Sequence, residues 1–366
     1  MPARGVVRYA LIGLGHIAQV AVVPAFAHAR RNSRLVALVS GDRAKRHEVA
    51  RRYRVEHVFD YDEYDACLEQ VDAVYIALPN HQHAEYTVRA AEAGVHVLCE
   101  KPMAPTVREC ERMIAACRRH RVRLMIAYRL HFEEINLRVV DLVGKGKIGE
   151  PKFFNSSFAM TVRRGDIRTK AAFGGGSLHD IGVYCINAAR YLFRAEPTEV
   201  LAASVNSGVK ALAEIDESTA AILRFEGERI ASFVTSFNAA DVAEYRIVGT
   251  KGQIHVDPAY EYAAGLGYTL TVDGRTQRRT IGRRDQFAPQ LLYFSDCIRE
   301  GRDPEPSGEE GLQDVRIVEA LLRSARTGRA VTLPPFRKAR RPTGRQRITR
   351  PGIPKPALVK AQSASE

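Results

Sequence analysis

The chain has few cysteines, and their spacing argues against both a CxxC redox site and a cysteine-based metal site. Its 366 residues include six cysteines, with no CxxC pair and no paired metal-ligand spacing. Several lie within apolar runs, where a small buried thiol is the ordinary interpretation. We therefore predict structural thiols at Cys67, Cys99, Cys110, Cys117, Cys185 and Cys297.

Long apolar runs are also missing. No stretch approaches the ~20 residues that a bilayer-spanning helix requires. The first residues, MPARGVVRYALIG, enter a strand-like pattern almost at once and leave no room for a signal peptide. The sequence therefore predicts a cytoplasmic protein without a membrane partner.

Basic residues exceed acidic ones, and most of the excess lies in one place. The net charge is +13, and residues 337–366 carry nine Lys or Arg and one acid. This tail has few core-forming residues and much proline, the composition of a disordered extension. A tail of this kind could touch polyanions, but no nucleic-acid reading motif accompanies it, so no specific nucleic-acid partner is predicted.

What the sequence does contain is a regular alternation over residues 6–126. Short apolar runs such as YALIGLG and VDAVYIALP alternate with helical patterns, as in a doubly wound parallel sheet. After Tyr128 the pattern changes to strand-like segments separated by turn residues. We predict an α/β protein with a Rossmann domain over 1–128, an α+β domain with a largely antiparallel open sheet over 129–333, and a basic tail over 334–366.

A glycine motif marks the first strand-to-helix turn. YALIGLGHIAQ places Gly13, Gly15 and Ala18 in a GxGxxA pattern, in which the glycines allow a tight turn and the close approach of a pyrophosphate. A turn that binds nothing is the alternative. The βα units that follow favour a dinucleotide site.

The end of the second strand indicates which dinucleotide is preferred. An NAD site usually has an acid there, whereas this chain has Ser40, with Asp42 two residues later. Ser40 leaves room for a 2′-phosphate, and Arg43 and Lys45 offer charge. NADP is therefore favoured, with NAD possible; alternatively the basic residues are a solvated helix face and Asp42 is a helix N-cap.

Four motifs occur in the order found in one enzyme family. GLGHIA, LPNHQH at 78–83, HVLCEKP at 96–102 and GGGSLHDIGVY at 174–184 together resemble the Gfo/Idh/MocA oxidoreductases. The resemblance runs from about residue 7 to 333 and is strongest to the glucose-fructose oxidoreductases. It implies an NAD(P)-dependent enzyme that acts on a CH–OH group of a sugar or polyol.

The resemblance also assigns catalytic roles. Lys101 matches the lysine of the EKP motif, Tyr184 the tyrosine that exchanges a proton with the substrate hydroxyl, and Asp180 the aspartate that binds the sugar. Asp180 and Tyr184 are four residues apart, so one helix face carries both. A free phenol titrates near pH 10, and an ammonium within ~4 to 6 Å favours the phenolate, so Lys101 is the expected activator.

The predicted cofactor-binding set combines strand-end positions with the resemblance. Two members have alternatives, since His83 could simply start a helix and Arg129 could form a domain-interface ion pair. His81 and His83 lack a third ligand nearby, so no metal is predicted. The set comprises Gly13, Gly15, His16, Ile17, Ser40, Arg43, Lys45, Leu78, Pro79, Asn80, His83, Glu100, Lys101 and Arg129.

The sequence departs from the glucose-fructose oxidoreductases in two respects. It lacks their proline-rich N-terminal arm, and RRGDIRTKAAF at 163–173, which should border the sugar, differs from their loop. The alternatives are a dihydrodiol or xylose dehydrogenase of the same family, or a non-catalytic NADP-sensing regulator. Some predicted strands have apolar residues at both odd and even positions, which suggests that both faces of the sheet are buried. This pattern predicts a homodimer or homotetramer.

Overall fold

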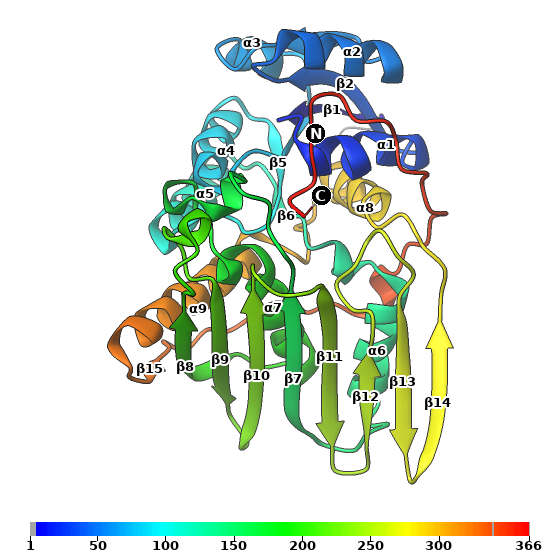
Figure 1. The fold of residues 1–366 in the computed structure, drawn as a ribbon. Helices are drawn as coiled ribbons and strands as arrows, with labels where there is room; N and C mark the ends of the chain where they lie inside the picture. The colour runs from blue at the N-terminus through cyan, green and yellow to red at the C-terminus, as the bar shows by residue number, and fades with distance from the viewer. Residues whose placement is uncertain (1–4, 339, 366) are drawn as a thin grey trace.

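Six short apolar runs form the first sheet. In the computed structural model, which describes residues 5–338 and 340–365, the parallel strands are arranged in the order β3-β2-β1-β4-β5-β6 (Figure 1). The order reverses between β1 and β4, where open α/β sheets bind ligands. The strands are β1 (Val7–Ile12), β2 (Ser33–Val39), β3 (His57–Phe59), β4 (Ala73–Ile76), β5 (His96–Cys99) and β6 (Leu124–Ile126).

Helices connect these strands, and their first residues explain where they begin. Asp42 caps the helix that follows β2 by accepting a hydrogen bond from the Lys45 N–H at 2.9 Å. Thr106 and Glu109 form a capping box at the start of another. The helices are α1 (Val23–Ala25), α2 (Arg43–Tyr53), α3 (Tyr64–Leu68), α4 (His83–Glu92) and α5 (Val107–Arg119).

Nine strands form the second sheet, in the order β14-β13-β12-β11-β7-β10-β9-β8-β15. All neighbours are antiparallel except β7 and β10, which run parallel. The sheet therefore has the mostly antiparallel character predicted from the sequence, and the predicted fold class is confirmed. The strands are β7 (Pro151–Ala159), β8 (Pro197–Val205), β9 (Ser218–Phe225), β10 (Arg229–Ser236), β11 (Val242–Gly249), β12 (Gly252–Val256), β13 (Gly267–Val272), β14 (Arg275–Thr280) and β15 (Val331–Thr332).

One face of the second sheet carries helices and the other is open. α6 (Glu134–Gly144), α7 (Val183–Phe193) and part of α9 (Gly308–Thr327) share a core with the buried strand residues. Burial alternates along β9, where Leu223 is buried and its neighbour Ile222 is exposed. The open face accordingly presents apolar side chains of several strands to solvent.

The domain division is less simple than the predicted boundary at 128/129. Helix α8 (Ala288–Glu300) lies in the range predicted for the second domain, yet its Leu291 and Phe294 pack with Tyr9 and Leu11 of β1. The Tyr9 and Ser295 hydroxyls lie 2.8 Å apart. The chain thus returns to the first sheet after completing most of the second.

The described part of the tail differs from the disordered extension that its composition predicts. Lys338 pairs with Glu305 at 2.9 Å, and Arg341 pairs with Glu196 at 2.7 Å. Apolar side chains pack against the core around the first sheet, namely Ile348, Ile353, Leu358 and Val359. The composition of the tail does not predict this ordered packing, because the tail is held by acidic and apolar side chains of the rest of the protein.

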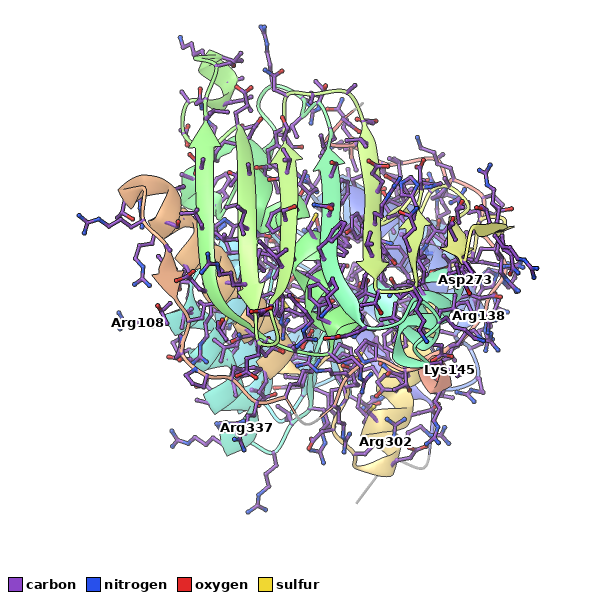
Figure 2. All side chains as sticks on the ribbon, turned by 90° about the horizontal axis from the view of Figure 1, so that it is seen from below. Arg108, Arg138, Lys145, Asp273, Arg302 and Arg337 are labelled. Atoms are coloured by element: carbon purple, nitrogen blue, oxygen red, sulfur yellow. The ribbon has the colours of Figure 1, made fainter. Side chains whose placement is uncertain are left out.

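Several basic side chains outside the rest of the tail lie on different elements. Figure 2 shows the labelled basic residues around the outline of the molecule, on different elements. No single basic stripe for a nucleic acid is formed by these residues, which are Arg108, Arg138, Lys145, Arg302 and Arg337. In the part of the chain that the structure describes, no helix is long and apolar enough to cross a membrane.

Candidate active site at the edge of the parallel sheet

The glycine turn after β1 has the shape that a dinucleotide requires. Gly13 has φ +93°, and a Cβ there would lie 2.6 Å from the Ala77 carbonyl oxygen, so only glycine fits. A Cβ at Gly15 would meet nothing within 4 Å, which leaves open space in front of the loop. His16 and Ile17 follow on the same turn and are partly buried. These residues therefore fit a pyrophosphate that approaches the backbone.

The end of β2 carries one serine and several charges. Ser40 is 4% exposed, and its carbonyl accepts a hydrogen bond from Arg46 at 2.7 Å. Arg46 also pairs with Asp60 at 2.6 Å, so its charge is already engaged. Arg43 is exposed and Lys45 is partly buried on the first turn of α2. Of the basic residues on this turn, Arg43 is the more accessible to a phosphate.

The turn after β4 connects the first domain to the glycine run. Asn80 donates a hydrogen bond from Nδ2 to the Gly174 carbonyl at 2.9 Å, while Leu78 is buried and Pro79 partly buried. His83 has a position different from the predicted one. Its Nε2 lies 2.9 Å from the Leu78 carbonyl oxygen and its Nδ1 3.0 Å from that of Pro102, so neither ring nitrogen faces a ligand. His83 starts α4 and holds two turns of the site together, in agreement with its alternative interpretation.

An ion triad lies at the end of β5. Lys101 Nζ donates to Asp180 Oδ1 at 3.0 Å and to the Asp180 carbonyl at 2.8 Å, and Arg168 Nε donates to Asp180 Oδ2 at 2.7 Å. Burial by itself would raise the pKa of Asp180, but Arg168 and Lys101 hold that pKa well below its usual range. Burial would lower the pKa of Lys101, but the Asp180 carboxylate keeps it above the usual value. The lysine and the aspartate are therefore both charged at neutral pH.

Tyr184 lies between two cations. Lys101 Nζ lies over its ring, 4.8 Å from the ring centroid, and Arg129 Nη2 donates to its hydroxyl oxygen at 3.2 Å. Phe158 and Tyr260 pack beside the ring, with centroid separations of 5.7 and 5.8 Å. The structure thus brings the three predicted catalytic side chains together. The cation nearest the phenol oxygen, however, belongs to Arg129.

Arg129 is held by neutral acceptors and forms no ion pair with the described residues. It is 5% exposed and donates to the Gln286 side chain, to the Tyr260 carbonyl and, at 3.3 Å, to the Glu261 carbonyl. Glu100, Glu133 and Glu261 lie near enough to interact with its charge. The Nη2 contact lets the same charge act on Tyr184.

Glu100 is occupied by the protein itself. Its Oε1 accepts from the Tyr75 hydroxyl at 2.6 Å and its Oε2 from the Lys101 N–H at 3.3 Å. Burial raises its pKa. Within the predicted cofactor set, Glu100 therefore supports the turn that carries Lys101.

The glycine run is required by its packing. Gly174 and Gly176 have φ values of +72° and +114°. A Cβ at Gly174 would lie 2.7 Å from Pro105 Cγ, and one at Gly175 would lie 2.3 Å from the Arg168 carbonyl oxygen. A π-helical turn over Leu178–Gly182 follows and carries Asp180 into α7. The run therefore lets the chain bend tightly before the helix that bears Asp180 and Tyr184.

Sequence reasoning did not select Arg168. This arginine also pairs with Asp166 at 3.2 Å, so the loop over 163–173 is fixed to the catalytic aspartate. The four basic residues in this loop were the available signal. Nothing local in the loop identified Asp180 as the partner.

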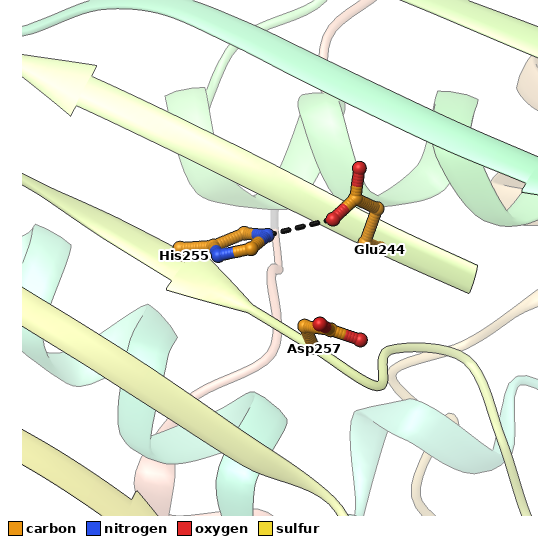
Figure 3. A group of neighbouring side chains, drawn as sticks. All are labelled: Glu244, His255 and Asp257. Carbon is orange, nitrogen blue, oxygen red and sulfur yellow. Dashed lines mark hydrogen bonds and ion pairs between the residues drawn. The ribbon is translucent and has the colours of Figure 1, made fainter. Parts of the chain in front are cut away.

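Three potential metal ligands meet elsewhere, on the open face of the second sheet (Figure 3). Among the described residues, Glu244, His255 and Asp257 bring ligand atoms within 4.8 Å of one another. His255 Nε2 and Glu244 Oε2 already lie 2.8 Å apart as a hydrogen-bonded pair. The group is separated from Tyr184 by the sheet, since Tyr245, the residue after Glu244, faces the helices. It takes no part in the site described above.

Comparison with known proteins gives a consistent result over most of the chain. Residues 7–128 match the family model described as "Oxidoreductase family, NAD-binding Rossmann fold", and residues 136–255 match the "GFO/IDH/MocA C-terminal domain". A D-xylose 1-dehydrogenase [NADP(+)] from Haloarcula marismortui is 34% identical over 337 residues, covering 89% of this chain and 93% of the relative.

Solved structures agree with this match. Aldose-aldose oxidoreductase from Caulobacter crescentus, complexed with glycerol, has a TM-score of 0.85 and 37% identity, and the match covers 90% of this chain and all of that one. A 3-ketoreductase from Actinomadura kijaniata, in complex with NADP and TDP-benzene, has a TM-score of 0.79 and 28% identity over 87% of this chain and 98% of that one.

Proposed function

The chain belongs to the GFO/IDH/MocA oxidoreductase family, and we propose that it transfers a hydride between NADP and a hydroxyl-bearing carbon of an aldose or related polyol. The observation that carries this proposal is the cluster of Lys101, Asp180 and Tyr184 at the end of the parallel sheet. When bound, NADP would supply the hydride acceptor or donor.

The residues of this chain that would hold the dinucleotide lie along the strand ends. Gly13 and Gly15 would admit the pyrophosphate, and Ser40 with Arg43 would accommodate a 2′-phosphate. The names of the xylose dehydrogenase and ketoreductase relatives, which include NADP, support the same preference.

Tyr184 would move the substrate proton. During oxidation its oxygen takes the proton of the substrate hydroxyl, and during reduction it returns that proton. Arg129, 3.2 Å from this oxygen, and Lys101, over the ring, would stabilise negative charge on it. Asp180 would orient Lys101 and accept a hydrogen bond from a sugar hydroxyl.

Two of the similar proteins favour an aldose substrate. The xylose dehydrogenase and the aldose-aldose oxidoreductase both act on aldoses by name. A relative from Danio rerio named as a dihydrodiol dehydrogenase is 31% identical over 62% of this chain, so that alternative has narrower support. A non-catalytic sensor would not require a proton-transferring tyrosine beside two cations.

A substrate screen tests this proposal. Purified protein would be mixed with NADP⁺ and a panel of aldoses and polyols, including D-xylose and D-glucose, and NADPH formation would be followed by absorbance. We expect reduction of NADP⁺ by at least one aldose and its loss in Lys101→Met. If no member of the panel is turned over in either direction while NADP binds, the catalytic proposal is wrong and the sensor alternative gains support.

A further inference from the structure

Residues 357–365 follow the rim of the dinucleotide site instead of leaving the protein. Val359 forms two hydrogen bonds with Gln19, from its N–H to Oε1 at 2.8 Å and from Nε2 to its carbonyl at 2.9 Å. Lys360 Nζ lies 3.1 Å from Asp42 Oδ2, and the Ala364 carbonyl accepts from the Arg163 N–H at 2.6 Å. We call this stretch the rim segment; Figure 1 draws the end of the chain in red as it passes over the α1 side of the first sheet.

Each of these contacts lies at a part of the proposed site. Gln19 also donates to the Leu14 carbonyl, within the glycine turn. Asp42 is two residues beyond Ser40, where the 2′-phosphate would lie, and Arg163 begins the loop that carries Arg168. Val359 and Ala364 are five positions apart in the chain, a path of at most about 18 Å. The rim segment therefore connects the glycine turn after β1 with the loop over 163–173 over a short distance.

The preceding part of the tail keeps the rim segment in place. Gln346 donates to Glu305 at 3.0 Å, and Arg350 donates to the His28 carbonyl at 3.2 Å. Leu358 and Val359 add apolar contact with the core of the first domain. These contacts hold the rim segment in one position, so little conformational entropy would be lost when a dinucleotide binds beside it.

We propose that the rim segment is part of the cofactor site, that it retards dissociation of the dinucleotide, and that Lys360 is a specificity residue for the 2′-phosphate. The inference rests on the proposed NADP-dependent function. The Lys360 side chain is 61% exposed, and among the described residues its ion pair is with Asp42, so it can turn toward a phosphate dianion, for which a compact ammonium is a suitable partner.

The test measures binding, independently of turnover. NADPH and NADH dissociation constants would be measured by nucleotide fluorescence, and NADPH dissociation rates by stopped-flow chase with excess NADP⁺. A chain ending at Pro356 and the full-length double variant Leu358→Asp/Val359→Asp should release NADPH at least about tenfold faster than the unmodified chain. Lys360→Met should weaken NADPH binding by roughly fivefold to tenfold and leave NADH binding unchanged.

Arg347→Ala is the matched control, because it removes an exposed positive charge from the same tail before the rim segment. This variant should change neither the NADPH dissociation rate nor the preference for NADPH over NADH. Circular dichroism would show that each variant is folded, and if the shortened chain is not, the full-length variants still decide the question. Unchanged NADPH release in the double variant, or equal losses of NADPH and NADH in Lys360→Met, would overturn the corresponding part of this inference. Failure of the unmodified chain to bind either nucleotide would instead refute the proposed function.

Discussion

The chemistry of the candidate active site depends on a few charged side chains that lie within a few ångströms of one another. Asp180 lies between two cations, and Tyr184 lies between Lys101 and Arg129. The arginine contacts the phenol oxygen directly, whereas the lysine contacts the ring and the aspartate. We therefore expect Arg129 to share the electrostatic role that sequence reasoning gave to Lys101 alone.

The role of Tyr184 is tested by removing only its oxygen. Tyr184→Phe should lower turnover by ~10²- to 10⁴-fold, the usual contribution of general acid–base catalysis. NADP binding should persist, because the phenol is assigned to the substrate side. Turnover and the NADP dissociation constant would be measured together, with Tyr53→Phe on α2 as control. Near-normal turnover on the best substrate of the screen would remove this tyrosine from the mechanism.

We predict that Ser40, at the end of β2, governs the choice between cofactors. In Ser40→Asp the new carboxylate would repel a 2′-phosphate and could accept a hydrogen bond from a 2′-hydroxyl. The ratio of kcat/KM for NADP to that for NAD should fall by about tenfold or more. Ser40→Ala, which keeps the space without adding charge, is the control. An unchanged ratio in the aspartate variant would reject this assignment.

A partly buried histidine ties two strands of the first sheet together, and this gives stability a pH dependence. His96 begins β5, and its Nδ1 accepts a hydrogen bond from the Arg123 N–H, which precedes β6, at 2.9 Å. Burial and the neighbouring Arg123 charge lower the pKa of His96 to about 4. The folded protein therefore holds this ring neutral down to a pH at which the unfolded chain would have protonated it.

We expect the free energy of unfolding to decrease as the pH falls from about 6.5 to about 4, because only the unfolded state gains a proton at His96 in that range. The contribution is at most about 3 kcal/mol. Burial lowers the pKa of His83 and His179 in the same direction, so the comparison must be made between variants. Urea unfolding of His96→Gln should show a shallower pH dependence than the unmodified chain, whereas His47→Gln, an exposed ring, should not. Identical slopes for the unmodified and His96→Gln proteins would contradict the prediction.

At the scale of the whole molecule, the second sheet leaves an apolar face uncovered. Residues exposed there include Phe153, Leu201, Ile222, Ile230 and Val234, at 38% to 48% exposure. They alternate with buried residues, so they form one continuous surface across β7, β8, β9 and β10. Contiguous apolar surfaces of this kind usually mark a protein interface.

A second copy of this chain is the predicted occupant of that face. Light scattering at micromolar concentration should give the mass of a dimer or tetramer. The double variant Ile222→Asp/Val234→Asp should lower that mass, because it places carboxylates in the middle of the surface. Val6→Asp, at an exposed apolar residue outside the sheet, should not. A monomeric mass for the unmodified chain would refute the prediction.

The sequence alone determined the features that local pattern encodes. Alternating apolar runs predicted the parallel sheet, Gly13 and Gly15 marked the phosphate turn, and the EKP and GGGSLHDIGVY motifs selected Lys101, Asp180 and Tyr184. The parallel sheet and the phosphate turn depend on neighbours within a few residues, so periodicity and spacing can reveal them. The roles of Lys101, Asp180 and Tyr184 were implied by the family resemblance that these motifs carry.

Only the tertiary structure decided contacts between distant segments. Lys101 and Asp180 are 79 residues apart, and Lys360 and Asp42 are 318 apart. The place of Arg168 beside Asp180, the return of α8 to the first sheet and the path of the rim segment all follow from such pairings. A basic, proline-rich tail has too few apolar residues to fold alone, but it becomes ordered where the body supplies Glu305, Asp42 and an apolar surface. Composition cannot show this, because the stabilising partners lie elsewhere in the chain.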